Sequence, residues 1–154
     1  MSTLSELISK ADYIAGRNHL LKSQWHTYRN SLTQAISAIN NEINHGFTCG
    51  EGNDIRFTLF NHFIVNIQLK DDFFSRDIIY SLNMAPTAEA PRFTAFAQAT
   101  LSEDGYIDNV VIRDKKAVLD HYLNKISAVY QCLFDALQTN QPIYTQLEKL
   151  LSRK

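Results

Sequence analysis

The sequence predicts an α+β fold: a long N-terminal helix, an antiparallel β-meander of about five strands, a C-terminal helix and a short tail helix. Three successive patterns support this prediction. Apolar residues recur three and four apart over residues 3–45, then at every second position from 54 to about 112, and again at helical spacing after 114. The first and last patterns put apolar side chains on one face of a helix, and the middle pattern puts them on one face of each strand.

The N-terminal segment carries a seam with the heptad spacing of a coiled coil. Asn18 takes an a-type position in the seam, where asparagine can fix the register and number of paired helices. Gly46 is the expected end of the helix, because glycine readily adopts the left-handed geometry of helix ends. The pattern permits one continuous helix or two helices separated near Gly16. The seam residues besides Asn18 are Leu4, Leu7, Ala11, Ile14, Leu21, Trp25, Tyr28, Leu32, Ala35 and Ile39.

A continuous helix over residues 3–45 would be about 60 Å long. A compact globule of 154 residues has a diameter of about 40 Å. The helix should therefore overhang its own domain, unless Gly16 bends it back. We favour an overhang that buries its seam against another chain.

The middle of the chain reads as an antiparallel meander with one solvated face. Strands are expected around residues 55–59, 63–69, 78–84 and 93–101, followed by a fifth short strand that ends near Ile112. A tight turn at Asn61 and His62 joins the first two, and Glu103, Asp104 and Gly105 form the last turn. Alanines at alternate positions of the fourth strand would let a helix approach closely.

Helical spacing returns after Asp114, which is a suitable N-cap. The apolar stripe of this helix contains Val118 or Leu119 and extends to Leu137. The helix should stop before Pro142, because the residue preceding a proline is pushed out of helical geometry. Residues 145–148 read Thr-Gln-Leu-Glu, a capping box that would open the tail helix. The stripe also includes Tyr122, Leu123, Ile126, Val129, Tyr130, Leu133 and Phe134.

Composition bounds the class of protein. We interpret residues 1–154 as one domain with a single core. The formal net charge is −1, with 15 Lys and Arg against 16 Asp and Glu, so direct nucleic-acid binding is not expected. The sequence has no apolar run of membrane-spanning length and no signal-peptide pattern at its start. Cys49 and Cys132 form no disulfide or metal spacing. These features favour a cytoplasmic protein with reduced thiols.

No catalytic, cofactor-binding or metal-binding residues are predicted. His19 and His26 lie two helical turns apart without a third ligand, so all five histidines are interpreted as hydrogen-bonded or exposed. The glycine-rich residues 45–52 follow a helix, whereas phosphate-binding loops precede one. Cys132 is about 16 Å along the helix from His121, too far for joint catalysis, and is interpreted as a buried structural thiol. The carboxylates Glu103, Asp104 and Asp108 are interpreted as solvated hairpin residues.

The chain's only tryptophan lies in the segment SQWHTYRNSL, residues 23–32. Base stacking by Trp25 and Tyr28 would need a basic surround, which Lys22 and Arg29 alone do not supply. Because both aromatic residues lie on the seam, burial against a helix or the sheet is the leading interpretation. The alternative is an exposed anchor for a partner protein, a role in which Trp and Tyr are enriched.

Two long segments resemble a known family. They are KADYIAGRNHLLKSQWHTYRNSLTQAI, residues 10–36, and IRDKKAVLDHYLNKISAVYQCLF, residues 112–134. These segments resemble the formate hydrogenlyase regulatory protein (HycA) family of enteric bacteria. The intervening segments LFNHFIVNI, residues 59–67, and SEDGYIDNVVIRD, residues 102–114, are similar in order and spacing. The resemblance covers most of the chain, from about residue 5 to 141.

The resemblance implies a non-enzymatic cytoplasmic protein that lowers transcription of formate hydrogenlyase and related hydrogenase operons. It would act as an anti-activator, opposing the formate-responsive transcriptional activator by protein contact, without binding DNA and without a cofactor. The family supplies no catalytic residues to transfer. From the pattern, we expect self-association as a homodimer or docking on the activator through Ile14, Asn18, Leu21, Trp25, Tyr28 and Leu32.

Two other functions remain open at this stage. One is a chaperone-like dimeric binding module that holds a protein client. The other is a small-molecule sensor or enzyme, which requires a pocket that sequence does not reveal.

Overall fold

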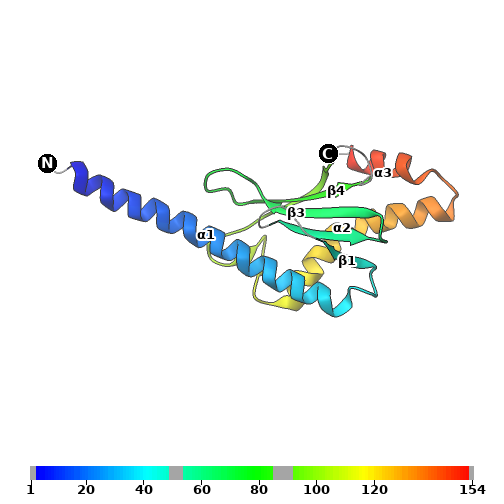
Figure 1. Cartoon of the computed structure of the whole chain (residues 1–154), viewed down its shortest axis with the longest axis horizontal. Coiled ribbons are helices and arrows are strands. Elements are labelled where there is room, and N and C mark those ends of the chain that lie inside the picture. The colour runs from blue at the N-terminus through cyan, green and yellow to red at the C-terminus, as the bar shows by residue number, and fades with distance from the viewer. Residues whose placement is uncertain (1–2, 49–53, 85–91, 153–154) are drawn as a thin grey trace.

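The computed structural model describes residues 3–48, 54–84 and 92–152. A five-stranded sheet is covered on one face by helices, and one helix extends far beyond the sheet (Figure 1). The elements are α1 (Thr3–Ile39), β1 (His45–Thr48), β2 (Ile55–Leu59), β3 (Phe63–Leu69), β4 (Asp77–Asn83), β5 (Thr94–Thr100), β6 (Tyr106–Ile107), β7 (Val110–Val111), α2 (Lys115–Gln138) and α3 (Ile143–Leu151).

The predicted fold class is confirmed, but the fifth strand is a different segment from the one expected. The main sheet is antiparallel throughout and follows chain order, β1-β2-β3-β4-β5. Its first strand, β1, lies within the glycine-rich residues 45–52, which were expected only to connect the first helix to the sheet. The segment that ends near Ile112 instead forms a separate two-stranded hairpin, β6 and β7.

Helix α1 is continuous through Gly16 and ends at Ile39, six residues before the expected end. Gly46 does not terminate it, because the left-handed residue after the helix is Asn44, with φ of 54°. Gly46 lies in β1 opposite Thr58. A Cβ atom at Gly46 would lie only 2.4 Å from the Thr58 side-chain oxygen. Glycine is therefore required there by the close approach of two strands.

The core lies between the sheet and the second half of α1 together with α2. Alternate residues of β2, β3 and β4 face these helices, as the period of two predicted. The hydroxyl oxygens of Tyr28 on α1 and Tyr80 on β4 are 2.7 Å apart, in a hydrogen bond inside the core. Each buried hydroxyl therefore has a partner, as buried polar groups require.

The C-terminal helices begin and end close to the predicted positions. The Asp114 side chain accepts a hydrogen bond of 3.2 Å from the Ala117 amide, which confirms it as the N-cap of α2. The capping box at Thr145 was wrong as a helix start, since α3 already begins at Ile143, directly after Pro142. Proline has no amide hydrogen and a helix-compatible φ, so it suits this boundary. The buried Leu147 and Leu151 hold α3 against the core.

The opposite face of the sheet is polar but only partly solvated. Asn66, Ser81 and Asn83 are buried there. The Asn66 side chain accepts a 3.0 Å hydrogen bond from Arg56, whose guanidinium lies over the ring of Phe93. Hydrogen bonding offsets the cost of burying such groups.

Candidate functional site

Helix α1 passes through two environments along its length. Every residue from Thr3 to Gly16 is exposed, whereas one face of the helix is buried from Leu21 onward. Figure 1 shows the N-terminal half projecting away from the sheet and from the other helices. We call residues 3–16 the overhang. An overhang was predicted from the helix length, and the structure confirms it.

The structure separates the six residues proposed as an association surface. Leu21, Trp25, Tyr28 and Leu32 are at most 4% exposed and belong to the core of this chain. Assigning these four to a partner surface was therefore a wrong interpretation, because the chain's own sheet and α2 cover that part of the seam. The leading interpretation of Trp25 and Tyr28, burial, is what the structure shows. Their rings lie 5.9 Å apart.

The other two proposed residues lie outside the packed core. Ile14 is 50% exposed within the overhang, and Asn18 is half-buried where α1 meets the domain. Leu7 and Leu4, about two and three turns further out than Ile14 on the same seam, are 57% and 71% exposed. The overhang therefore presents a row of large apolar side chains that continues the buried seam. Isolated exposed leucines are common on proteins, but an ordered row of them indicates a contact surface.

A cluster of charged residues holds the overhang at its root. The guanidinium of Arg17 makes two hydrogen bonds to the Glu103 carboxylate, and Arg76 donates a third of 3.0 Å. Gln24 donates a 2.9 Å hydrogen bond to the Glu103 backbone carbonyl. The bonds from the two arginines, chiefly those from Arg17, lower the pKa of Glu103. Bidentate pairing of this kind fixes direction as well as distance, so it orients α1 as the helix leaves the domain.

The interpretation of the hairpin carboxylates as solvated holds for the exposed Asp104 and Asp108 but is wrong for Glu103. The Glu103 side chain is only 10% exposed. Asp108 accepts a 2.9 Å hydrogen bond from the Thr100 amide and a 2.8 Å contact from His121, which lower the pKa of Asp108 despite its partial burial. Because Arg17 and Glu103 are 86 positions apart, no local pattern in the sequence pairs them.

A second exposed apolar surface lies on α2. Phe134 is 58% exposed and Leu137 is 65% exposed, and both belong to the predicted apolar stripe. They follow Tyr130 by four and seven positions on the helix, so they share its face. The exposed Phe60 packs its ring 5.5 Å from that of Tyr130. We call Phe60, Phe134 and Leu137 the α2 patch.

The histidines are hydrogen-bonded or exposed, as predicted. His45 is buried, with Nε2 2.8 Å from the Tyr122 hydroxyl and Nδ1 3.1 Å from that of Tyr130. Burial lowers the pKa of His45, because the charged imidazolium loses hydration there. In the part of the chain that the structure describes, no three His, Cys, Asp or Glu side chains gather closely enough to hold a metal ion.

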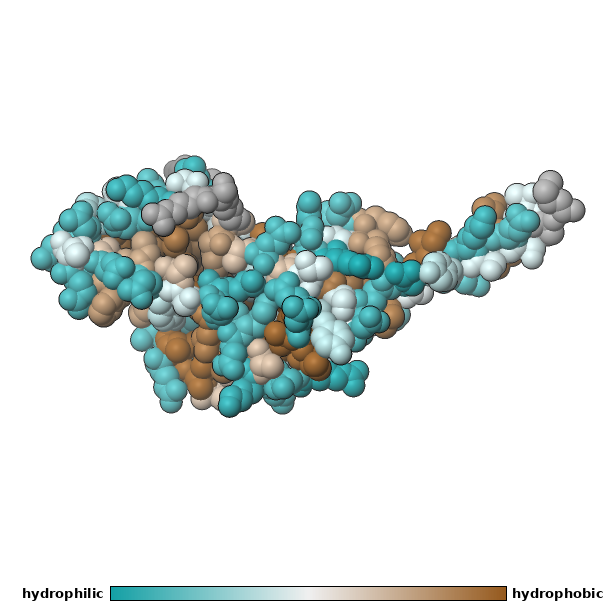
Figure 2. Space-filling model, turned by 180° about the vertical axis from the view of Figure 1, so that it is seen from behind, coloured by the Kyte–Doolittle hydropathy of each residue, from teal (hydrophilic) through white to brown (hydrophobic). Residues whose placement is uncertain are grey.

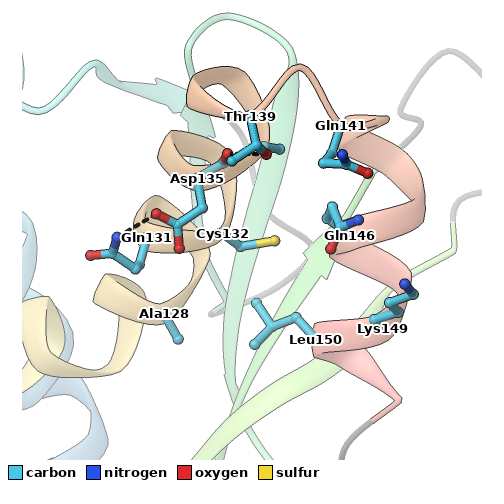
Figure 3. A pocket seen from close by; sticks show the side chains of 10 residues that line it. Ala128, Gln131, Cys132, Asp135, Thr139, Gln141, Gln146, Lys149 and Leu150 are labelled. Carbon is cyan, nitrogen blue, oxygen red and sulfur yellow. Dashed lines mark hydrogen bonds between the residues drawn. The ribbon is translucent and has the colours of Figure 1, made fainter.

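Cys132 lines a hollow of about 350 Å³ between α2 and α3. Figure 3 shows its sulfur directed across the hollow toward Gln146 on α3, with the hydrogen-bonded pair Gln131 and Asp135 on the same side as Cys132. The thiol is partly buried rather than buried as expected. Burial and the nearby Asp135 raise its pKa, which disfavours the nucleophilic thiolate form.

These features define a class of protein. The α+β protein presents two exposed apolar surfaces, the overhang and the α2 patch. In Figure 2, apolar side chains also appear near the root of the overhang and on the body. None of the described helices is long and apolar enough to cross a membrane. Two exposed apolar surfaces of this kind are available for contact with another protein.

Comparisons with known proteins identify the family. Residues 2–149 match a family described as the transcriptional repressor of hyc and hyp operons. The chain is 42% identical over 142 residues to the formate hydrogenlyase regulatory protein HycA of Escherichia coli strain K12, covering 92% of this chain and 91% of that protein. HycA of Escherichia coli O157:H7 and of Shigella flexneri match equally well. No solved structure matches significantly. The chain belongs to the HycA family.

Proposed function

We propose that this chain is a negative regulator of formate hydrogenlyase operon expression that acts as an anti-activator. It binds the formate-responsive transcriptional activator by protein contact, in the cytoplasm, as one regulatory domain spanning residues 1–154, and it needs neither catalysis nor a cofactor. Membership of a repressor family supports the regulatory role. The main observation in favour of action by protein contact is that the overhang and the α2 patch are apolar rather than basic.

The charge distribution favours contact with protein over contact with DNA. Acidic residues outnumber basic ones by one, 16 against 15. Several cations are already paired within the chain: Arg17 and Arg76 contact Glu103, and Lys125 lies 3.8 Å from Asp108. A protein that binds DNA directly normally neutralises several phosphates with clustered Lys and Arg.

The α2 patch is the surface that we propose for the activator. Its two aromatic rings and one leucine match the enrichment of aromatic residues at protein interfaces. The patch belongs to the packed body, because Tyr130 beneath it donates a hydrogen bond to the Ile43 carbonyl. A contact surface held in place loses little conformational entropy on binding.

Repression then follows from mass action. Activator bound to this protein is withdrawn from its productive state. The degree of repression should depend on the concentration of unbound regulator divided by the dissociation constant. Raising the activator concentration should relieve repression, whereas adding promoter DNA alone should not.

A promoter-activity assay with surface variants tests the proposal. Phe134→Glu and Leu137→Glu should each abolish most of the repression, because a carboxylate would be desolvated at the contact. Asn124→Glu is the matched control: it adds the same charge at an exposed position on α2, about 15 Å along the helix from Phe134. It should repress like the parent protein.

These variants and two further measurements distinguish the alternatives. Full repression by both α2-patch variants would refute the proposed surface. Retention of promoter DNA by the purified chain without activator would refute the anti-activator mechanism. Capture of a protein client in cells that lack the activator would favour the chaperone-like binding module.

A further inference from the structure

We propose that the overhang is a self-association surface on which two copies of this chain pair as antiparallel helices. The exposed seam of one chain thus packs against the same seam of a second chain. This inference concerns assembly and is independent of the proposed regulatory activity. Three observations support it. The exposed seam continues the buried one, only one pairing direction leaves room for both domains, and one register pairs apolar residues throughout.

The seam of the overhang continues an interface that is already built within the chain. In heptad positions, Leu4 and Ala11 are equivalent to Trp25 and Leu32, which are buried against the sheet and α2. A straight helix drifts by about 20° per heptad relative to this repeat, so the drift over the three heptads from Leu4 to Trp25 is about 60°. The exposed row therefore lies on approximately the side of α1 on which the domain lies. It is a packing surface that the chain's own domain does not reach.

The position of the domain decides the direction of pairing. In a parallel pair, the two helices would face each other through seams that, from Leu21 onward, are already covered by each chain's own sheet. Both domains would then compete for the space between the helices. Helices that pack with coiled-coil geometry cross at about 20°, which opens far too little space for two domains. An antiparallel pair places the two domains at opposite ends and avoids the conflict.

One antiparallel register matches every seam residue of the overhang with an apolar partner. Leu4 faces the partner's Ile14, Leu7 faces the partner's Ala11, and the same contacts recur by symmetry, which makes four layers. Leucine opposite alanine alternates large and small side chains, as close packing requires. Moving the partner by one heptad toward the domain would place Leu7 opposite Asn18 of the partner subunit and Leu4 opposite its buried Leu21. Moving it one heptad away would leave only two layers.

In the preferred register, the paired segment ends before the part of α1 that contacts the domain. The partner's Thr3 comes opposite Ala15, two residues or about half a turn before Arg17, which binds Glu103. Asn18 lies beyond the paired segment, so a polar residue marks its limit. The seam from Leu4 to Ile14 is about 15 Å long, which is short for a stable interface. We therefore expect a reversible dimer that dissociates on dilution.

Light scattering across a dilution series of the full chain measures the assembly. The expected mass approaches twice 17.6 kDa at high concentration and falls toward one chain on dilution. Leu7→Glu should raise the dissociation constant at least tenfold, while Ser9→Glu, which adds the same charge on the far side of the overhang, should leave it unchanged. Both positions are exposed in a single chain, so both variants should melt at the same temperature at concentrations at which the chain is monomeric. A monomer at every concentration, or equal dissociation constants for the two variants, would overturn the proposal.

Disulfide trapping tests direction and register. In a background in which Cys49 and Cys132 are replaced by serine, a mixture of Leu4→Cys and Ile14→Cys chains should form a cross-linked heterodimer under mild oxidation. Leu4→Cys chains alone should not cross-link, because their thiols lie at opposite ends of an antiparallel seam. Efficient cross-linking of Leu4→Cys alone would indicate a parallel pair and contradict the proposed arrangement.

Discussion

Replacing Trp25 by alanine distinguishes a core role from a partner-binding role for the chain's only tryptophan. The side chain is 4% exposed and packs beside Tyr28 between α1 and the sheet. Removing a large buried aromatic side chain deletes its contacts and leaves a cavity, at a cost of about 3–5 kcal/mol. For a chain of this size, about 2–4 °C of melting temperature corresponds to each kcal/mol. We expect the melting temperature to fall by about 6–20 °C.

The assay is thermal and urea unfolding followed by far-ultraviolet circular dichroism, because the variant lacks tryptophan fluorescence. His26→Ala is the matched control, since His26 is the next residue on the helix and is exposed. Alanine is the better helix former, so this variant should lie within about 0.5 kcal/mol of the parent. If Trp25→Ala lost less than about 1 kcal/mol but bound a partner more weakly, the tryptophan would be a surface anchor and the core assignment would be wrong.

Further predictions concern the glycines and the buried histidine. Gly46→Ala should destabilise the protein by about 1–2 kcal/mol, because the added Cβ meets the Thr58 side chain; urea titration should show the loss, and Thr58→Ala should largely relieve it. Gly16→Ala should instead stabilise by about 0.5–1 kcal/mol, since nothing lies within 4 Å of the new Cβ and alanine favours a helix; a loss of stability would refute the open environment. The lowered pKa of His45 means that the unfolded chain binds the proton more readily. The contribution of His45 to the unfolding free energy should therefore be fully present above about pH 6.5. It should decrease as the pH falls below that value, by at most about 1.4 kcal/mol per pH unit. His45→Gln should flatten this dependence between pH 5 and 6.5, above the range in which Glu103 and Asp108 titrate; an unchanged slope in urea titrations would contradict it.

Periodicity was enough to predict the fold class and most element positions. The seam of α1, the alternation in β2 to β4 and the Asp114 cap are local signals, and each corresponds to an observed element. β1 was missed because its four residues, His45 to Thr48, show no apolar alternation. The reason for Gly46 lies in Thr58, on the neighbouring strand. A local pattern does not contain that information.

The candidate surfaces were only partly predictable for a related reason. Burial within the chain and burial against a partner require the same apolar spacing, so the seam alone did not show where the domain stops covering it. The structure places that limit near Asn18, and Trp25 belongs to the core. Similarly, the apolar stripe predicted on α2 did not show which of its members stay exposed. The packing of α1, α3 and the sheet against α2 leaves Phe134 and Leu137 exposed.

Co-purification with the formate-responsive activator tests the central claim most directly. The purified full chain would be mixed with the activator, with and without formate, and the stoichiometry of any complex measured by light scattering. The proposed mechanism predicts a stable complex that survives Asn124→Glu and is lost with Leu137→Glu. Clean self-association of this chain with no bound activator, under either condition, would contradict the anti-activator mechanism.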